Sequence, residues 1–268
     1  MRHRGEPAHG AYAGRVDQTA PEGVTITFAG SGDAFGSGGR FQACIHLRPH
    51  DGTDAVLLDC GTTSLAALRR AGLDPGEVGT VVLSHLHGDH FGGLPFLILD
   101  GQFRRRVAPL RIAGPPGTPG RLRQAMEVLF PGSADVARRY DVVTFELSPG
   151  LTTRVGGLEV TAWEAVHPSG APPLILRLDI GGRRIAYTGD TAWTDAITTA
   201  ARGADLLIAE AYTMDREIRY HLSHAALARH RDDFGDTPVV LTHMSGDVLA
   251  RLGDAAFPPA HDGLELRV

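Results

Sequence analysis

Residues 85–90 read His85-Leu86-His87-Gly88-Asp89-His90, and they directly follow the apolar run Val81-Val82-Leu83 and Ser84. A short apolar run of this kind indicates a buried strand that gives way to a loop. Imidazole and carboxylate groups together suit zinc and its neighbours among the divalent metals. Three histidines and one aspartate are more ligands than one tetrahedral ion takes easily from six residues. The segment therefore predicts a metal site with ligands for two ions, and the alternative is a His-rich surface turn.

The composition is that of a globular chain with a large core. The chain has 268 residues, 43% of them hydrophobic, and a formal charge of −5. Charges of both signs are interspersed, which gives no basic footprint for nucleic acid and no polybasic membrane patch. Cys44 and Cys60 are too few for a disulfide framework, and no apolar run approaches the length of a membrane span. We expect a cytoplasmic protein with a flexible arm over residues 1–23 and a single catalytic domain over residues 24–268.

Strand and helix patterns alternate along that domain. A Gly-rich loop at residues 30–39 follows the first strand, but no helix start and Lys follow it, so a phosphate-binding loop is disfavoured. Apolar alternation and short apolar runs predict strands, and longer apolar or capped segments predict helices. Strands are expected at residues 24–29, 42–47, 55–58 and 110–113, and helices near 62–72, 91–99, 119–130 and 134–140.

Three later apolar runs also end on residues that bind metals. Residues 158–166 lead to His167, residues 184–188 lead to Asp190, and residues 239–242 lead to His243. If these strands and the one before His85 lie side by side in one direction, their ends converge on one rim of the sheet. Each residue alone has an ordinary interpretation, a buried histidine or a helix cap. Considered together with residues 85–90, His167, Asp190 and His243 are predicted metal ligands, because two ions need more ligands than residues 85–90 supply.

The order and contexts of these residues resemble the metallo-β-lactamase fold superfamily of binuclear metallohydrolases, over nearly all of residues 24–268. The resemblance implies an α/β (α+β) fold, a four-layer αββα sandwich of two mixed sheets with the site along one edge. It implies two divalent metal ions, expected to be zinc, with manganese or iron as alternatives. Asp59 resembles the family aspartate that hydrogen-bonds a ligand histidine, and a turn residue is the alternative. The implied ligands are His85, His87 and His167 for one ion, Asp89, His90 and His243 for the other, and Asp190 as the bridge.

Further segments resemble the ribonuclease Z branch and its phosphodiesterase relatives. They are Phe28-Ala29-Gly30-Ser31-Gly32, His90-Phe91-Gly92-Gly93-Leu94-Pro95, Gly114-Pro115-Pro116-Gly117, Glu210-Ala211-Tyr212 and His221-Leu222-Ser223. The resemblance implies catalytic roles for His221 and Glu210 beside the metals, with Asp89 as the third catalytic residue. His224 has no counterpart in the branch and is expected to be a solvated or capping histidine.

Departures from the branch narrow the expected function. Residues 168–189 have room for one hairpin and not for the long arm that grips tRNA, and Ala209 stands where the branch usually has a histidine. His87 in place of a glutamate argues against the di-iron flavoprotein oxidases of this fold, and Asp190 in place of a cysteine argues against true β-lactamases. Asp33, Phe35 and the segments around Phe96 and Pro168 are the expected pocket walls.

We therefore expect a hydrolase of a small, nucleotide-type phosphodiester, which acts through a metal-bridging hydroxide and forms a homodimer. Nucleic acid and membrane partners are disfavoured. Hydrolysis of a carboxylic ester, lactone or thioester is the main alternative. A tRNA 3′-processing endonuclease and a non-catalytic binding module are weaker ones.

Overall fold

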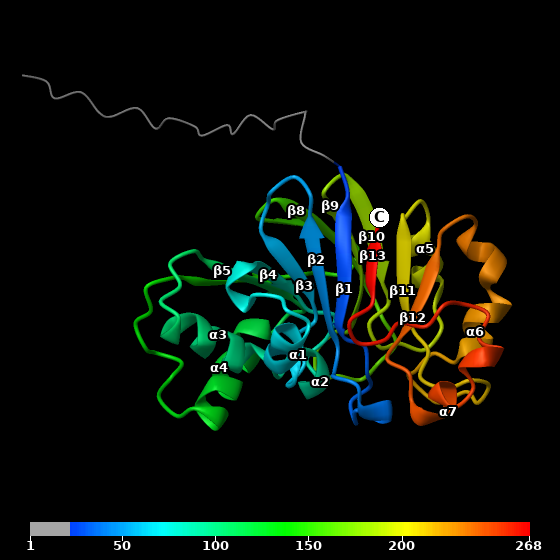
Figure 1. Ribbon diagram of the computed structural model, residues 1–268, viewed down its shortest axis with the longest axis horizontal. Coiled ribbons are helices and arrows are strands. Elements are labelled where there is room, and N and C mark those ends of the chain that lie inside the picture. The colour runs from blue at the N-terminus through cyan, green and yellow to red at the C-terminus, as the bar shows by residue number, and fades with distance from the viewer. Residues whose placement is uncertain (1–21) are drawn as a thin grey trace, which may run out of the picture.

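Two facing β sheets form the centre of the protein in a computed structural model that describes residues 22–268 (Figure 1). The first sheet has the order β13-β1-β2-β3-β4-β5-β6, and the second has the order β12-β11-β10-β9-β8-β7. Both sheets are mixed, because each combines antiparallel pairs with parallel ones. The first sheet contains β1 (Val24–Gly30), β2 (Cys44–Pro49), β3 (Ala55–Leu58), β4 (Val78–Val82), β5 (Leu110–Gly114), β6 (Val142–Glu146) and β13 (Glu265–Arg267). The second contains β7 (Thr152–Val155), β8 (Leu158–Glu164), β9 (Leu174–Ile180), β10 (Arg183–Tyr187), β11 (Leu206–Glu210) and β12 (Val239–Thr242).

Helices cover the outer faces of the two sheets, as Figure 1 shows. The helices on the side of the first sheet are α1 (Ser64–Arg70), α2 (Gly88–Phe91), α3 (Leu94–Phe103) and α4 (Thr118–Leu129). Those on the side of the second sheet are α5 (Asp195–Ala201), α6 (His224–Arg229) and α7 (Gly246–Leu249). Short 3-10 helices occur at Ser37–Gly39, Pro75–Glu77, Arg231–Phe234 and Leu252–Asp254.

Three apolar clusters hold these layers together. The first lies between the sheets and includes Phe28 and Leu176. The second joins the second sheet to its helices through residues such as Ile197, and the third joins the first sheet to its helices through residues such as Leu94. Burial of apolar surface on both sides of each sheet stabilises a four-layer arrangement. The predicted αββα sandwich is confirmed.

The strand ends that carry the predicted ligands come from both sheets. β8, β10 and β12 belong to the second sheet and run in the same direction, because β8 and β10 are each antiparallel to β9 and β10 is parallel to β11 and β12. β4 belongs to the first sheet. The simple expectation of one shared rim within one sheet is therefore wrong, and the ends meet across the edge of the sandwich.

Two helix predictions need correction. The helix expected at residues 91–99 is divided into α2 and α3, because the Gly93 amide donates to the Cys60 carbonyl oxygen at 2.8 Å and not to the carbonyl oxygen four residues earlier. A Cβ at Gly93 would lie 2.2 Å from the Gly61 carbonyl oxygen, so only glycine allows this approach. Residues 134–140 form no helix. The segment forms turns instead, and the Tyr140 hydroxyl at its end donates to the Ile98 carbonyl oxygen at 2.6 Å.

Two further expectations concern the connections. β9 and β10 form the predicted single hairpin within residues 168–189. The predicted arm lies outside the described residues, apart from Glu22 and Gly23, and the Gly23 amide donates to the Gly181 carbonyl oxygen at 2.8 Å. Within residues 22–268, no helix has both the length and the apolar character that a membrane crossing requires.

Candidate metal centre

The first group of predicted ligands contains three histidines from two sheets. His85 and His87 lie in the segment after β4, and His167 follows β8. His87 Nδ1 lies 3.2 Å from His85 Nε2 and 3.0 Å from His167 Nε2. Two ligand atoms at about 2.0–2.1 Å from a tetrahedral ion are themselves about 3.3 Å apart. The three nitrogens therefore have the spacing of ligands around one ion, and their ligand atoms could hold one.

The second group contains Asp89, His90 and His243. His243 Nε2 lies 3.2 Å from both His90 Nε2 and Asp89 Oδ2, and His90 Nε2 lies 3.3 Å from Asp89 Oδ2. One imidazole nitrogen carries at most one proton and cannot hydrogen-bond all of these neighbours. A shared cation explains such a cluster better than hydrogen bonding does.

Asp190, which the family resemblance implied as the bridge, lies between the two groups. Its Oδ1 is 3.3 Å from His90 Nε2 and 3.5 Å from His243 Nε2. Its Oδ2 is 3.9 Å from His85 Nε2 and 4.0 Å from His167 Nε2. Asp190 Oδ1 and His243 Nδ1 are buried without a hydrogen-bond partner among the described residues, which is costly unless another group satisfies them.

The charges within the cluster also favour a bound cation. Burial and the neighbouring His90 lower the pKa of His85, so this ring is neutral and able to bind a metal. Burial opposes charge on His90 and His243 too, but Asp190 and the other carboxylates outweigh it and raise the pKa of both. Burial likewise opposes the ionised form of Asp190, yet His243 and His90 lower its pKa well below the usual range. Positive charge beside these carboxylates is therefore favourable, and a metal ion held by the clustered ligand atoms could supply it in place of imidazole protons.

Asp59 is placed as the resemblance implied. It is fully buried after β3, and its Oδ2 accepts a hydrogen bond from His90 Nδ1 at 2.7 Å. The same carboxylate accepts bonds from the Ser84 amide and hydroxyl and from the Tyr187 hydroxyl, at 2.7, 2.8 and 2.8 Å. These bonds fix the His90 ring so that Nε2 faces the other ligands.

Backbone strain concentrates at this edge. Among residues 22–268, four non-glycine residues have positive φ, and three of them serve the site: Asp59 (58°), Tyr220 (72°) and His243 (53°). The Tyr220 carbonyl oxygen accepts a hydrogen bond from His167 Nδ1 at 3.0 Å, which leaves His167 Nε2 free to face the cluster. Such conformations cost about 1–3 kcal/mol each and persist where the surroundings enforce them.

Glu210 and His221 form a pair beside the clusters. Glu210 ends β11 and is fully buried, with Oε1 accepting from the Thr191 and Leu222 amides at 2.5 and 3.2 Å. Its Oε2 lies 3.0 Å from His221 Nδ1, and that nitrogen is 3.9 Å from Asp190 Oδ2. Burial and Asp190 raise the pKa of Glu210, whereas burial lowers the pKa of His221. The His221 side chain keeps 21% of its surface exposed and lines a cavity, and Nε2 is the ring nitrogen that Glu210 does not occupy.

The sequence missed several contributors and an alternative arrangement. The Tyr212 ring packs on His221 with centroids 4.7 Å apart, and nothing in its sequence context signals this contact. Glu210, His221, Asp190 and His243 also form a group that could itself hold an ion.

His224 is buried rather than solvated, and its Nε2 accepts from the Ala256 amide at 2.8 Å. Asp33 is buried as well, and it holds its own loop by accepting from the Phe35 and Ser37 amides at 3.2 and 2.9 Å.

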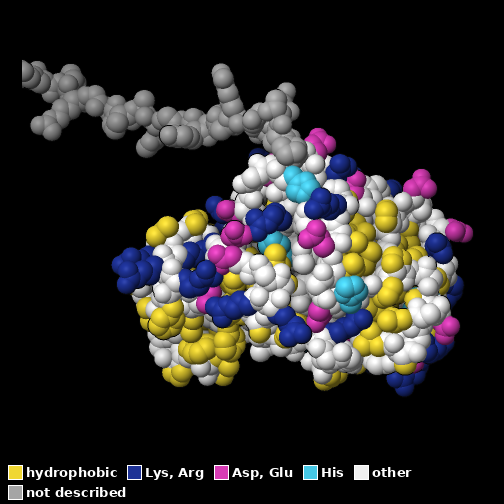
Figure 2. Space-filling view, viewed as in Figure 1, with side chains coloured by type: hydrophobic (Ala, Val, Ile, Leu, Met, Phe, Trp, Pro, Cys, Tyr) yellow, Lys and Arg dark blue, Asp and Glu magenta, His cyan; other side chains and the backbone are white. Residues whose placement is uncertain are grey.

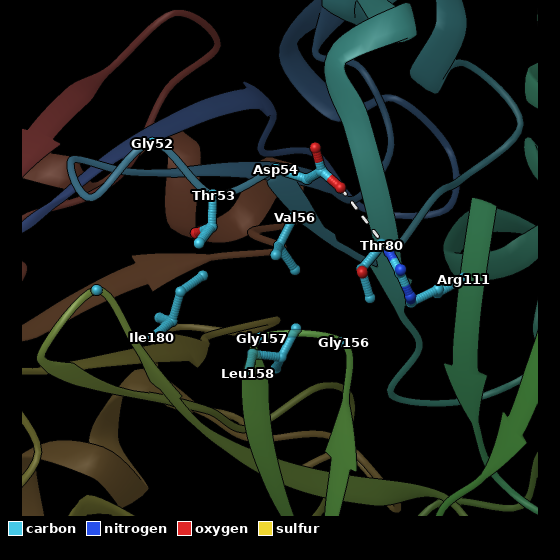
Figure 3. A pocket seen from close by; sticks show the side chains of 11 residues that line it. Gly52, Thr53, Asp54, Val56, Thr80, Arg111, Gly156, Gly157, Leu158 and Ile180 are labelled. Carbon is cyan, nitrogen blue, oxygen red and sulfur yellow. Dashed lines mark ion pairs between the residues drawn. The ribbon is translucent and has the colours of Figure 1, made fainter. Parts of the chain in front are cut away.

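A cavity of about 300 Å³ at the other end of the sandwich contains none of the predicted site residues (Figure 3). Its walls come from the Gly52–Asp54 and Gly156–Gly157 turns and from the first halves of β3 and β8. Arg111 and Asp54 face each other across it at 3.8 Å. The histidines and aspartates instead follow the carboxyl ends of their strands, so this cavity is separate from the metal centre.

Known proteins resemble this chain in sequence and in fold. Ribonuclease Z of Methanosarcina acetivorans is 29% identical over 274 aligned residues, which cover 83% of this chain and 88% of that protein. The short form of human tRNase Z superimposes with a TM-score of 0.73 at 24% identity, over 90% of this chain and 98% of that one. A diphosphatase from the PhnP family gives 0.70 at 18% identity, over 92% and 97%.

The matched family region contains all of the clustered residues. The model of the beta-lactamase superfamily domain matches residues 54–244, which begin before Asp59 and end just after His243. This region is well over half of the chain. The chain therefore belongs to the beta-lactamase superfamily.

Proposed function

We propose that this protein is a metal-dependent hydrolase that cleaves a phosphodiester. The observation that carries the proposal is the position of Asp190 between two groups of ligand atoms, with the Glu210–His221 pair alongside. The ribonuclease Z and PhnP-family relatives support the same class of reaction. Because the clustered residues come from both halves of residues 24–268, we treat that range as one catalytic unit.

Two divalent ions fit the donor set, and zinc is our first choice. Neutral imidazoles and carboxylates without a thiolate also suit manganese or iron. When bound, such ions lower the pKa of water toward neutrality and neutralise charge on a phosphoryl group. The residues proposed to hold them are His85, His87 and His167, then Asp89, His90 and His243, with Asp190 shared.

His221 is the proposed proton donor to the leaving group. Its Nδ1 is bonded to Glu210, so Nε2 is the atom that can reach a substrate oxygen. When the phosphorus–oxygen bond breaks, its electron pair moves to the leaving oxygen, and the proton from His221 Nε2 transfers to that oxygen. Glu210 orients the imidazole through its bond to Nδ1. Positioned acids of this kind contribute about 10²- to 10⁴-fold in rate.

A small phosphodiester is the favoured substrate. The β9–β10 hairpin leaves no long arm between His167 and Asp190 with which to grip a folded RNA. Figure 2 shows basic side chains interspersed with acidic and apolar ones on the face in view, without a continuous basic band. RNA is the second candidate, because the curated relative is a ribonuclease Z. A carboxylic ester, lactone or thioester is the alternative with different chemistry.

A homodimer is the proposed assembly. Apolar side chains gather over α3 and α4 at the lower left of Figure 2. Phe103, Val107 and Val128 are 81%, 74% and 80% exposed, which is unusual for a surface that faces only water. Light scattering coupled to size exclusion tests this proposal, and Val128→Glu should convert a dimer to a monomer.

The function is tested with His221→Ala and a panel of substrates. The panel contains bis(p-nitrophenyl) phosphate, methyl thymidine 5′-phosphate, a precursor tRNA, a lactone and a glutathione thioester. The variant should lose about 10²- to 10⁴-fold in kcat on the diester with an alkoxide leaving group, and less on the nitrophenyl ester, whose leaving group needs no proton. Its metal content, measured by inductively coupled plasma mass spectrometry, should match the wild type.

Two results would overturn these assignments. Loss of metal in His221→Ala would make His221 a ligand, as the group with Glu210, Asp190 and His243 allows. Faster hydrolysis of the lactone or thioester, unaffected by His221→Ala, would assign the enzyme to carbonyl chemistry.

A further inference from the structure

A second cavity, of about 470 Å³, adjoins His221. Its walls come from segments that follow β8, β10 and β11 and from α6, so it opens at the same edge of the sandwich as the metal centre. About half of the lining residues are apolar or aromatic, among them Val166, Trp193, Ile218 and Tyr220, and the others are polar or charged. A cavity of this size that combines aromatic and apolar walls with polar groups can hold a small molecule.

Trp193 gives the cavity a flat and ordered wall. Its ring stacks on His230 with centroids 3.7 Å apart and an interplanar angle of 13°. His230 is held in turn by Asp233, with Nδ1 and Oδ2 2.7 Å apart, and the Phe234 ring lies near the indole with 6.1 Å between the ring centroids. A wall held in this way loses little freedom when a ligand binds.

The charges around the cavity disfavour a cationic ligand. Arg229 pairs with Glu217 at 3.0 Å, and Arg219 lies over the Tyr220 ring with 4.6 Å from the guanidinium carbon to the centroid. With two arginines and one glutamate, the lining carries a net positive charge. A flat group that is neutral or negative fits these walls.

The cavity is linked to the metal centre through two neighbouring residues. His221 lines the cavity and bonds Glu210, while the Tyr220 carbonyl oxygen accepts from His167 Nδ1 at 3.0 Å. A proton donor must touch the leaving oxygen, and a group attached to that oxygen must then occupy space next to the donor. The cavity beside His221 could hold such a group.

We propose that the cavity binds the leaving group of the phosphodiester, and that this group is a nucleoside whose base lies against Trp193. The inference rests on the proposed function. In the reaction, the oxygen of water forms a new bond to phosphorus while the bond between phosphorus and the nucleoside oxygen breaks. The nucleoside oxygen keeps the electron pair and receives the His221 proton, and a proton from the attacking water replaces the one that His221 has lost.

Methyl thymidine 5′-phosphate offers an internal test, because it can release either thymidine or methanol. The wild type should release thymidine in preference. Trp193→Ala should lower the ratio of thymidine to thymidine 5′-phosphate about tenfold, as expected from the energy of stacking a base on an aromatic side chain. Trp193→Phe should restore most of the ratio. Trp163→Phe, which changes the second of the two tryptophans, should leave the ratio unchanged. An unchanged ratio in Trp193→Ala would overturn the proposal.

Binding provides a readout that does not depend on turnover. In Trp163→Phe the remaining tryptophan is Trp193. Thymidine should therefore quench the fluorescence of Trp193 in a saturable way. Because thymidine is uncharged, Arg219 and Arg229 should not prevent its binding. Absence of quenching would overturn the cavity assignment even if the enzyme is active. Saturable quenching in a protein that cleaves no phosphodiester would support a nucleoside site here and refute the proposed function.

Discussion

Asp59→Asn should weaken metal binding about 10- to 100-fold, because it disturbs the group that orients His90. The two carboxylate oxygens accept four hydrogen bonds. Oδ1 accepts from the Ser84 amide, and Oδ2 accepts from the Ser84 hydroxyl, His90 Nδ1 and the Tyr187 hydroxyl. An asparagine amide keeps one oxygen and replaces the other with an NH₂ donor.

Neither orientation of that amide preserves the site. If the NH₂ replaces Oδ1, it faces the Ser84 amide, and a buried donor without an acceptor costs about 1–3 kcal/mol. If it replaces Oδ2, it faces His90 Nδ1, and His90 must move its proton to Nε2. That nitrogen lies 3.2 Å from His243 Nε2 and 3.3 Å from Asp89 Oδ2, so the proton would occupy the metal-binding lone pair. A 10- to 100-fold change corresponds to about 1.4–2.8 kcal/mol, which agrees with the cost of one lost bond.

Competition with a chelating dye measures the zinc affinity of Asp59→Asn. Tyr187→Phe is the matched control, because it removes one donor to the same carboxylate and leaves the His90 bond intact. The control should bind zinc almost as tightly as the wild type. Wild-type affinity and stoichiometry in Asp59→Asn would refute the argument that this carboxylate sets the His90 tautomer.

The placement of the predicted ligands could be anticipated from the sequence because each one follows a strand. Strand ends are recognisable from apolar runs, and a sheet brings distant strand ends together. Asp190 and His243 illustrate this, since Asp190 lies three residues beyond β10, His243 directly follows β12, and both reach the segment after β4. The division of those strands between two sheets was not visible in the runs themselves, because an apolar run does not specify its partner strand.

The supporting residues could not be anticipated in the same way. Tyr187 and Tyr220 act through one hydroxyl and one backbone carbonyl oxygen, and neither contact leaves a pattern in the sequence. The break between α2 and α3 depends on the bond from the Gly93 amide to the Cys60 carbonyl oxygen, which only tertiary structure reveals. Trp193 is similar, because a lone tryptophan before a helix gives no sign that it stacks on a histidine from another segment.

Two further predictions concern metal content and acid stability. Asp190→Ala should lose at least one metal ion per chain, measured by mass spectrometry. The control Asp205→Ala, which removes a remote ion pair with Arg183, should lose none. Retention of both ions in Asp190→Ala would contradict the bridging role. The second prediction concerns His46, which is buried in β2 with neither ring nitrogen hydrogen-bonded among the described residues. Burial lowers the pKa of His46 from 6.5 to about 4, so the unfolded chain binds a proton more readily between these values. The folded state therefore has its full stability above about pH 6.5 and loses about 3 kcal/mol as the pH falls toward 4. His46→Leu should flatten that part of the pH dependence in urea unfolding of the metal-free protein, and parallel pH profiles for the variant and the wild type would show that another group is responsible.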